Sequence, residues 1–330
     1  MGSNIAHRLL QNGSRVTLFD NLSRKGSAEN LEWLRNCGSL DFIEGDVSDR
    51  DRIGNAIEQV HPNVIFHLAG QVAMTTSVTD PIRDFQTNVV GSVNLLEAVR
   101  TKCPEASVLY SSSNKVYGSL PGVRLESKEF RYVAPDYPNG VAEDALLDFR
   151  TPYGCSKGAA DQYMLEYART YGLNTAVFRH STIYGGRQHS TYDQGWVGWF
   201  CQQALDQKKN KDCLPFTISG DGKQVRDLLY VDDAVNCYLA AAEHIEKVSG
   251  QAFNIGGGFS NSCSLLELFS MLEGMLGIKL RFQKLVWRHE DQRLFVADNS
   301  KIRSFTGWLP KITREDGVTM TLEWIHKNLN

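Results

Sequence analysis

The chain has 330 residues, of which 42% are hydrophobic and 22% charged, and its 35 Lys and Arg against 38 Asp and Glu give a net charge of −3 at pH 7. This length and composition are typical of a globular protein with a large core. The near balance of charge gives no reason to expect a nucleic acid or an anionic membrane surface as partner, and no apolar run approaches the roughly 20 residues that a membrane-spanning helix needs. We expect neither nucleic acid nor membrane among its partners.

The spacing of the cysteines and histidines predicts a protein with reduced cysteines and without a metal site. The seven cysteines are scattered and form no C-x-x-C pair. This usage is typical of a cytoplasmic protein whose thiols are small buried groups. The eight histidines show neither H-x-x-x-H nor Cys/His ligand spacing, so we expect no metal.

Strand and helix patterns alternate, with short connections, in the first half of the chain. Helices are predicted before residue 13 and over 50–60, 84–100 and 151–172, and strands over 15–20, 40–47, 63–70, 106–113 and 174–185. The last of these helices has Pro152 near its first turn and Gly172 as its stop. Strands that are apolar throughout and separated by helices favour a parallel sheet covered on both faces, which is a doubly wound α/β fold.

The pattern loosens after Gly185. Strand-like pieces at 215–220 and 252–258 and helices at 232–245, 264–276 and 315–327 predict a smaller, discontinuous lobe at the sheet's C-terminal edge. We expect one domain over 1–185 and, mainly, a second lobe over 186–330 whose segments partly return to the first domain.

The chain opens with a helix, a glycine turn and a strand that ends at Asp20. In a doubly wound dinucleotide-binding fold, a strand and a glycine-rich loop precede such a helix, whereas here only Met1 does. We therefore expect that the first strand and most of this loop are missing, which leaves the neighbouring strands unpaired. A misplaced start site is the favoured explanation, and a degraded remnant is the alternative.

The most specific chemical signal is the pair Tyr153 and Lys157. Positions i and i+4 share one helix face, and a nearby ammonium lowers the pKa of a phenol, which favours a general base. Ser113 ends the preceding strand and adds a hydroxyl at the same edge of the sheet. The spacing alone also fits a partly exposed Tyr and Lys on an ordinary helix.

An acidic strand end predicts a dinucleotide site. Asp20 can accept hydrogen bonds from the adenosine ribose hydroxyls, which favours NAD over NADP, although it can also simply open the turn that follows. Segments 45–47 and 67–73 follow neighbouring strands and would lie near the adenine and near the pyrophosphate or ribose.

Eight segments together resemble the extended short-chain dehydrogenase/reductases that act on nucleotide-sugars. They are FDNLSR, FHLAGQVAMTTS, SSSNKVYG, TPYGCSKGAADQY, FRHSTIYGGRQ, GDGKQVRDLLYVDD, FNIGGG and DQRLFVAD. The resemblance runs from Gly2 to about Trp324. It implies a Rossmann domain that binds NAD over 1–185, a nucleotide-sugar lobe mainly over 186–330, and a homo-oligomer paired through the helix that carries Tyr153.

Within this family, HLAGQVAMTTS, YGCSKGAADQY and DQGWVGWFCQ resemble the epimerases that invert C2 of CDP-linked 3,6-dideoxyhexoses. The resemblance implies conversion of CDP-paratose to CDP-tyvelose, for surface polysaccharide synthesis, by transient oxidation to a keto-sugar and return of the hydride. Tyr153 would take the proton, Ser113 would bond the reacting oxygen, and Lys157 would hold the nicotinamide ribose.

The resemblance also implies binding residues. Those implied for NAD are Gly2, Asp20, Asn21, Ser23, Arg24, Asp46, Val47, Leu68, Ala69, Gln71, Asn88, Tyr153, Lys157 and His180. Those implied for the substrate are Thr75, Thr182, Arg187, Gln194, Arg226, Arg288 and Arg293. Guanidinium forks suit diphosphate oxygens, although any one arginine also fits a solvated surface charge. Segment 194–200 either shapes the cytidine pocket or is the apolar face of a packed helix.

Three alternatives remain open to different degrees. A UDP-sugar 4-epimerase would share every catalytic residue named above. A 4,6-dehydratase needs a further acid and base after the fifth strand, where this chain has Ser113-Asn114-Lys115 without a carboxylate, so it is disfavoured. A truncated, non-catalytic nucleotide-binding protein is the alternative of a different class.

Overall fold

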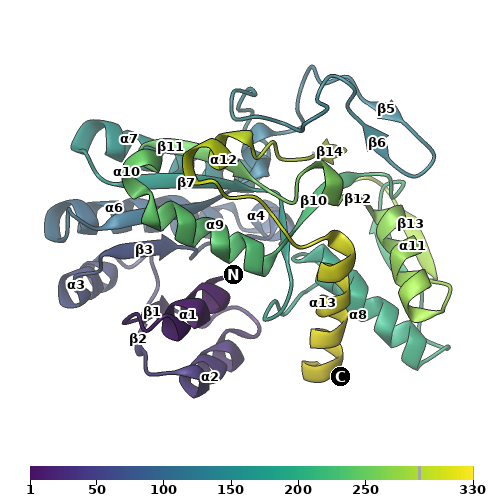
Figure 1. The fold of residues 1–330 in the computed structure, drawn as a ribbon, viewed down its shortest axis with the longest axis horizontal. Coiled ribbons are helices and arrows are strands. Elements are labelled where there is room, and N and C mark those ends of the chain that lie inside the picture. The colour runs from purple at the N-terminus through teal and green to yellow at the C-terminus, as the bar shows by residue number, and fades with distance from the viewer. Residues whose placement is uncertain (289–290, 330) are drawn as a thin grey trace.

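The computed structural model describes residues 1–288 and 291–329. Its main sheet has four parallel strands in the order β11-β7-β4-β3. These strands are β3 (Val64–His67), β4 (Ser107–Ser113), β7 (Thr175–His180) and β11 (Gln251–Ile255). Both central strands are almost fully buried, as expected for apolar strands in a covered parallel sheet. The predicted doubly wound α/β fold is confirmed (Figure 1).

Helices cover both faces of this sheet. On one side lie α3 (Arg50–Val60), α6 (Gly91–Lys102) and α7 (Thr151–Tyr171); on the other lie α9 (Val231–Glu243), α10 (Ile245–Val248) and α12 (Ser300–Thr306). Because side chains alternate along a strand, Val108 and Tyr110 of β4 pack with the first group, whereas Leu109 between them packs with the second. The sheet is therefore the middle layer of three.

Helix α7 has the boundaries that the sequence predicts. A proline occupies its first turn, where the missing N–H costs nothing, and Gly172 ends it in the left-handed conformation with φ of 70°. Its inner face is buried against β4 and β7. This fixes where the residues of its first two turns lie.

The first two strands form a separate parallel pair. β1 (Thr17–Asp20) pairs with β2 (Asp41–Glu44), and α1 (Gly2–Gln11) and α2 (Ser27–Cys37) belong to the same unit. Within the described residues, β1 pairs only with β2 and β3 only with β4, so both strands have an unpaired edge, as predicted. A cavity of about 590 Å³ is lined by residues of both units, among them Leu18 and Phe66.

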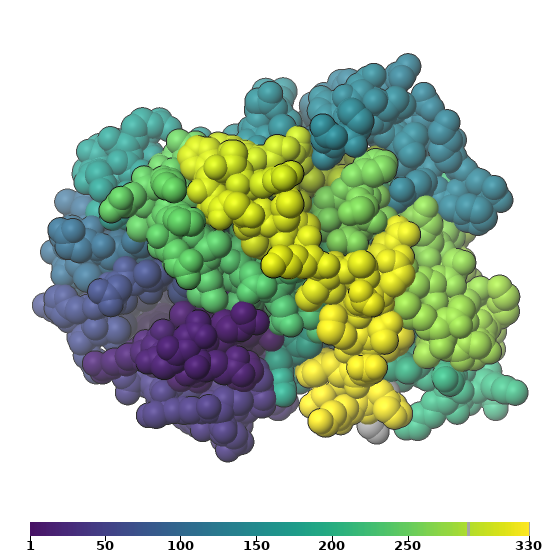
Figure 2. Space-filling model, viewed as in Figure 1, coloured from purple at the N-terminus to yellow at the C-terminus, as the bar shows by residue number. Residues whose placement is uncertain are grey.

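The second lobe contains a mixed sheet of β8 (Thr182–Tyr184), β10 (Val225–Tyr230), β12 (Ser262–Ser264) and β14 (Leu294–Phe295). Two smaller pairs are β9 (Phe216–Ser219) with β13 (Phe282–Leu285) and β5 (Glu126–Ser127) with β6 (Tyr132–Val133). Its helices are α8 (Trp196–Lys209), α11 (Leu265–Leu276) and α13 (Arg314–Asn328). β11 follows residue 186 in the chain but pairs with β7 in the main sheet, whereas β8 and the β5–β6 pair precede residue 186. In Figure 2 the yellow C-terminal segment lies across this face between the purple N-terminal unit and the light-green second lobe.

Short helices connect these elements: α4 (Met74–Thr79), α5 (Pro81–Phe85), the π-turn η1 (Gln86–Val90), the 3₁₀ turn η2 (Asn114–Tyr117) and the 3₁₀ turn η3 (Phe259–Asn261). None of the helices described between residues 1 and 329 is long and apolar enough to cross a membrane. The expectation of buried thiols holds for Cys201, Cys237 and Cys263 but is wrong for Cys37 and Cys155, which are exposed because they face outward on α2 and α7.

Candidate active site

The carboxyl end of β4 and the first two turns of α7 bring Ser113, Tyr153 and Lys157 together. Their residues are 7%, 8% and 3% exposed. The Ser113 side chain acts on the Tyr153 hydroxyl and favours its ionised form. The Lys157 ammonium donates to the Ser111 carbonyl and lies 4.5 Å from the centre of the Tyr110 ring. The i, i+4 spacing thus places a phenol and an ammonium on the inner face of one helix, beside a strand-end hydroxyl.

Burial dominates the protonation of these groups. Burial raises the pKa of Tyr153 to about 12, and the Ser113 side chain only partly offsets this rise. The predicted lowering of this pKa is therefore wrong for the chain by itself. Burial also lowers the pKa of Lys157 to about 7, against the opposing charges of Asp84 and Asp161. Lys157 is therefore an ammonium that can lose its proton near neutral pH.

A buried polar network supports α7 from the side of the π-turn. Asp84 accepts hydrogen bonds from Ser156 and, at 2.9 Å, from Gln71 Nε2. Asn88 Nδ2 donates to Ser156 Oγ at 2.9 Å, and its Oδ1 accepts from the Gln71 backbone N–H at 2.9 Å. Burial raises the pKa of Asp84. Gln71 and Asn88, both predicted to bind NAD, thus position the catalytic helix, and their role toward the cofactor stays a prediction.

Asp84 and Ser156 belong to this buried network beside the candidate catalytic residues, and the sequence did not reveal them. An acid in a segment of turn-like helices looks like a surface charge until the tertiary structure buries it. Ser156 lies between Tyr153 and Lys157 in the sequence. This position between the two candidate catalytic residues is the sequence feature from which it could have been predicted.

His180 ends β7 on the other side of the same crevice. Its Nδ1 lies 3.3 Å from Ser111 Oγ and its Nε2 lies 2.7 Å from the Tyr238 hydroxyl. Burial lowers the pKa of His180 to about 3, so the imidazole is neutral and links two elements rather than carrying charge.

The cavity of about 590 Å³ has the features of a dinucleotide site. Of the residues predicted to bind NAD, it is lined by Gly2, Asp20, Arg24, Val47, Leu68, Ala69 and His180. The N-terminal end of α1 lies at this cavity, where backbone N–H groups suit phosphate, and the Asp20 carboxylate ends β1. Asn21 Nδ2 donates a hydrogen bond to Asp46 Oδ2 at 2.7 Å, and the Ser23 N–H donates to Asn21 Oδ1. The residues present fit NAD.

A second polar cluster lies on the side of the second lobe. Arg226 Nη2 is 3.3 Å from Asp291 Oδ1 and donates to the Gln292 carbonyl at 2.7 Å. Lys115, two residues after Ser113, is 3.3 Å from the same Asp291 oxygen. Lys115 and Asp291 were not predicted, although both lie in segments that carry the family resemblance.

The other predicted substrate residues are only partly brought to this cluster. Arg288 acts electrostatically on Lys115 and Asp291 and stacks on Tyr192, with its guanidinium 5.2 Å from the ring centre. Arg293 instead lies over Tyr132 at 5.4 Å.

Arg187 lies elsewhere, between two aromatic rings at the dinucleotide cavity. Its guanidinium is 4.0 Å from the centre of the Trp33 ring and 5.9 Å from that of Trp324. It lines the cavity together with Asp20, so the structure does not bring it beside Arg226.

The start of α8 shows how segment 194–200 packs. Trp196 donates its Nε1–H to Thr182 Oγ1 at 3.1 Å, while Val197 and Phe200 are buried in the main core. Segment 194–200 thus includes part of the apolar face of a packed helix, and its role at a cytidine pocket stays a prediction. Gln194 lines the dinucleotide cavity, and Thr75 lies on α4; their roles stay predictions.

Known proteins resemble the chain over almost its whole length. It is 52% identical over 324 residues to the CDP-paratose 2-epimerase of Salmonella typhi, covering 98% of this chain and 96% of that protein. The UDP-glucose 4-epimerase of Thermotoga maritima, solved with UDP-glucose, has a TM-score of 0.84 and 32% identity and covers 100% of this chain and 96% of that one. A Thermus thermophilus UDP-glucose 4-epimerase in complex with NAD has a TM-score of 0.81 and 26% identity, with coverage of 99% and 96%.

The family model for the NAD dependent epimerase/dehydratase family matches residues 1–256. This range holds β4, α7, the dinucleotide cavity and Arg226. It also holds the Ser113, Tyr153 and Lys157 set. The chain therefore belongs to the NAD dependent epimerase/dehydratase family, as a nucleotide-sugar epimerase with NAD as its cofactor.

Proposed function

We propose that the chain inverts C2 of a CDP-linked 3,6-dideoxyhexose, converting CDP-paratose to CDP-tyvelose. The observation that supports this most is the buried set of Ser113, Tyr153 and Lys157, since the Lys115 backbone N–H contacts Ser113 and the Lys115 side chain shares Asp291 with Arg226. The 52% identity to a CDP-paratose 2-epimerase across nearly the whole chain supports the choice of sugar and nucleotide.

The chain's own groups divide the work of the reaction. NAD, when bound, supplies a reversible hydride acceptor. Tyr153 takes the proton of the C2 hydroxyl and later returns it, and Ser113 donates a hydrogen bond to the oxygen that becomes the ketone. Lys157 holds a ribose hydroxyl through its ammonium and provides the positive charge that the Tyr153 phenolate needs.

Inversion requires the keto-sugar to present its opposite face while its nucleotide stays bound. Arg226 and Arg288 supply fixed cations for the diphosphate, for which a guanidinium fork is suited. We propose that 1–185 holds NAD and that 186–330 mainly holds the nucleotide-sugar, since Arg226 and Asp291 lie in the second part.

The test is conversion of CDP-paratose followed by proton NMR at C2. We expect CDP-tyvelose to form with wild-type protein and UDP-glucose to remain unchanged. Formation of UDP-galactose with CDP-paratose untouched would show a 4-epimerase instead.

Two variants on α7 separate the chemistry from the fold. Tyr153→Phe removes the proton acceptor and should lower kcat by at least about 100-fold with the bound NAD unchanged. Tyr163→Phe, on the exposed side of the same helix, is the matched control and should keep full activity. Full activity of Tyr153→Phe would refute the catalytic assignment.

We also propose a homo-oligomer. Val78, Ile82 and Phe85 are exposed apolar side chains on α4 and α5, and both helices contact α7. Light scattering after gel filtration should give at least twice the mass of 37.0 kDa. Val78→Glu with Ile82→Glu should give that of one chain.

A further inference from the structure

Lys115 is a charged side chain that the reaction described above leaves without a task. It lies on η2, the turn that directly follows β4, and its backbone N–H donates to the catalytic Ser113 Oγ at 3.2 Å. The side chain is only 17% exposed, which is unusual for a lysine. The turn therefore fixes the start of this side chain relative to the reacting position.

The segment around residue 291 holds this turn from the opposite side. Asn114 Nδ2 donates to Gln292 Oε1 at 2.9 Å, and Gln292 Nε2 donates back to the Asn114 carbonyl at 3.1 Å. Both residues are buried. Two reciprocal hydrogen bonds thus fix the turn of Lys115 to the residue next to Asp291.

Counted over the residues that the structure describes, the cations of this cluster outnumber its carboxylates. Lys115 Nζ and Arg226 Nη2 are each 3.3 Å from the same Asp291 oxygen, and Arg288 also acts on this carboxylate. Burial tends to raise the pKa of Asp291, but the three cations hold it below its ordinary value. Among residues 1–288 and 291–329, the other acid that acts on Arg226 is Asp227, which burial leaves with a raised pKa of about 6.

Three cations around one ionised carboxylate are costly to bury without a further anion. Burial accordingly lowers the pKa of Lys115 to about 8, with Asp291 opposing this and both arginines adding to it. The diphosphate of a nucleotide-sugar, which carries one negative charge on each phosphate, is the ligand that would offset the excess positive charge.

The position of Lys115 says which phosphate this is. Ser113 marks the carbon that reacts, and in a nucleotide-sugar the phosphate nearest to the sugar is bonded to C1. A cation on the Ser113 turn is therefore at the sugar end of the diphosphate. C1 is adjacent to C2 but lies across the ring from C4, so a phosphate held beside Ser113 places C2, rather than C4, at the catalytic groups.

We propose that Lys115 binds the sugar-proximal phosphate of the substrate and thereby selects C2 as the reacting carbon. This assigns the residue a role in specificity that rests on the proposed function. Arg226, which contacts the same Asp291 oxygen as Lys115, binds the same phosphate. Lys115 moves no proton in the reaction.

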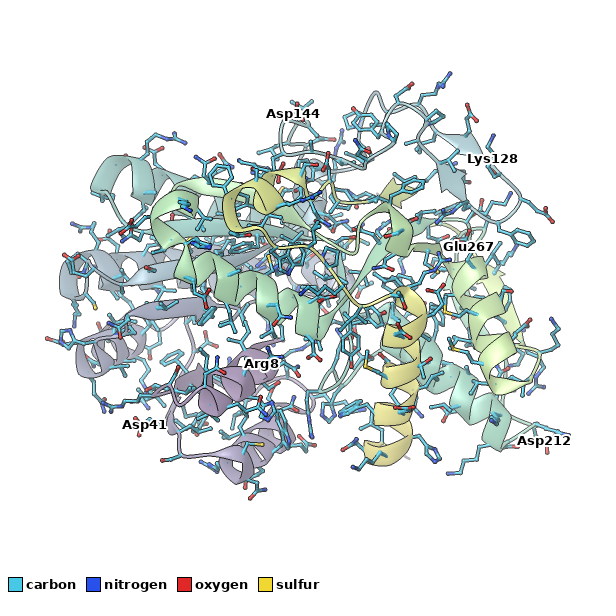
Figure 3. The ribbon with its side chains drawn as sticks, in the orientation of Figure 1. Arg8, Asp41, Lys128, Asp144, Asp212 and Glu267 are labelled. Carbon is cyan, nitrogen blue, oxygen red and sulfur yellow. The ribbon has the colours of Figure 1, made fainter. Side chains whose placement is uncertain are left out.

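Titration calorimetry of the NAD-loaded protein with CDP and with CMP tests the proposal, because CMP lacks the second phosphate. Lys115→Met should raise the Kd of CDP about 10-fold and leave that of CMP within about 2-fold. Lys115→Arg keeps the charge and should bind CDP within about 3-fold of wild type. Lys128→Met, on the outer β5–β6 hairpin, is the matched control and should change neither Kd (Figure 3).

Equal CDP binding by wild type and Lys115→Met would overturn the proposal. Lys115→Gln, which still can donate to Asp291, carries the same expectation if the methionine variant folds poorly, as judged by its NAD content. Failure of the two proposals is distinguishable: CDP binding that depends on Lys115 without turnover of CDP-paratose refutes the proposed reaction but not the phosphate contact. Turnover by wild type with unchanged kcat and KM in Lys115→Met refutes the role of Lys115 alone.

Discussion

The ion pair between Asp161 and Arg179 is the most deeply buried one described, and it fixes the catalytic helix to the sheet. Asp161 is 0% exposed and Arg179 4%. The guanidinium donates twice to the carboxylate, from Nε to Oδ2 and from Nη2 to Oδ1, each at 2.9 Å. Ser112 of β4 donates to Oδ2 at 2.7 Å, and Arg179 Nη1 donates to the Tyr117 hydroxyl at 3.0 Å.

Asp161→Asn should therefore destabilise the fold severely. The amide has one acceptor oxygen instead of two, and its NH₂ group faces a guanidinium that can only donate. The variant leaves a buried positive charge without its counter-ion, which costs about 3–5 kcal/mol. This is a large share of the roughly 5–15 kcal/mol by which folded proteins are stable.

Urea denaturation followed by circular dichroism at pH 7 measures this loss. The control is Glu166→Gln on the same helix, where Glu166 pairs with Arg169 in solvent and the expected loss is below about 1 kcal/mol. A loss below about 1 kcal/mol for Asp161→Asn would refute the reasoning. The double variant Asp161→Asn with Arg179→Met should be more stable than Asp161→Asn alone, since removing both charges leaves none unpaired, and equal or lower stability of the double variant would also refute it.

The same variant has a second consequence, in the pH dependence of activity. Asp161 opposes the effect of burial on Lys157, so its removal lowers the pKa of Lys157 further below about 7. The ammonium form is then lost at lower pH, and the alkaline limb of the kcat/KM profile should move to lower pH. An unmoved limb would contradict the assigned role of the Lys157 charge.

Two further predictions concern stability. His67 is buried beside Ser92, and burial lowers its pKa to about 3. Below pH 6.5 the unfolded chain therefore binds a proton that the folded chain does not, and the free energy of unfolding decreases as the pH is lowered. At pH 5 this amounts to about 2 kcal/mol, and His67→Gln should shrink the difference in unfolding free energy between pH 7 and pH 5 by that amount; an unchanged difference would contradict it. Gly257→Ala should lower the free energy of unfolding by about 1–3 kcal/mol, because a Cβ there would lie 2.1 Å from the backbone carbonyl oxygen of Leu228. At Gly274 in α11 a Cβ meets no atom within 4 Å, so Gly274→Ala should raise the free energy of unfolding by up to about 1 kcal/mol. Equal melting temperatures of the two alanine variants would refute the steric argument.

Local sequence was sufficient to predict the elements that position the reaction. Pro152 and Gly172 define the ends of α7 because proline suits a first turn and glycine a left-handed cap. The i, i+4 spacing then places Tyr153 and Lys157 on one face whatever the helix packs against. The apolar stretches 108–110 of β4 and 176–178 of β7 favoured a sheet covered on both sides, and the structure has it.

The sequence by itself thus determined α7, most of the main parallel strands and the spacing of the candidate catalytic pair, because each depends on neighbours a few residues away, whereas it did not reveal α2 or α12. The tertiary structure alone decided which distant charges meet and what burial does to them. Lys115 and Asp291 are 176 positions apart and share a contact only because two loops converge there, and Arg187 lies between Trp33 and Trp324 rather than beside Arg226. The pKa of Tyr153 rises rather than falls, since desolvation depends on every element packed around the phenol and leaves no trace in local spacing.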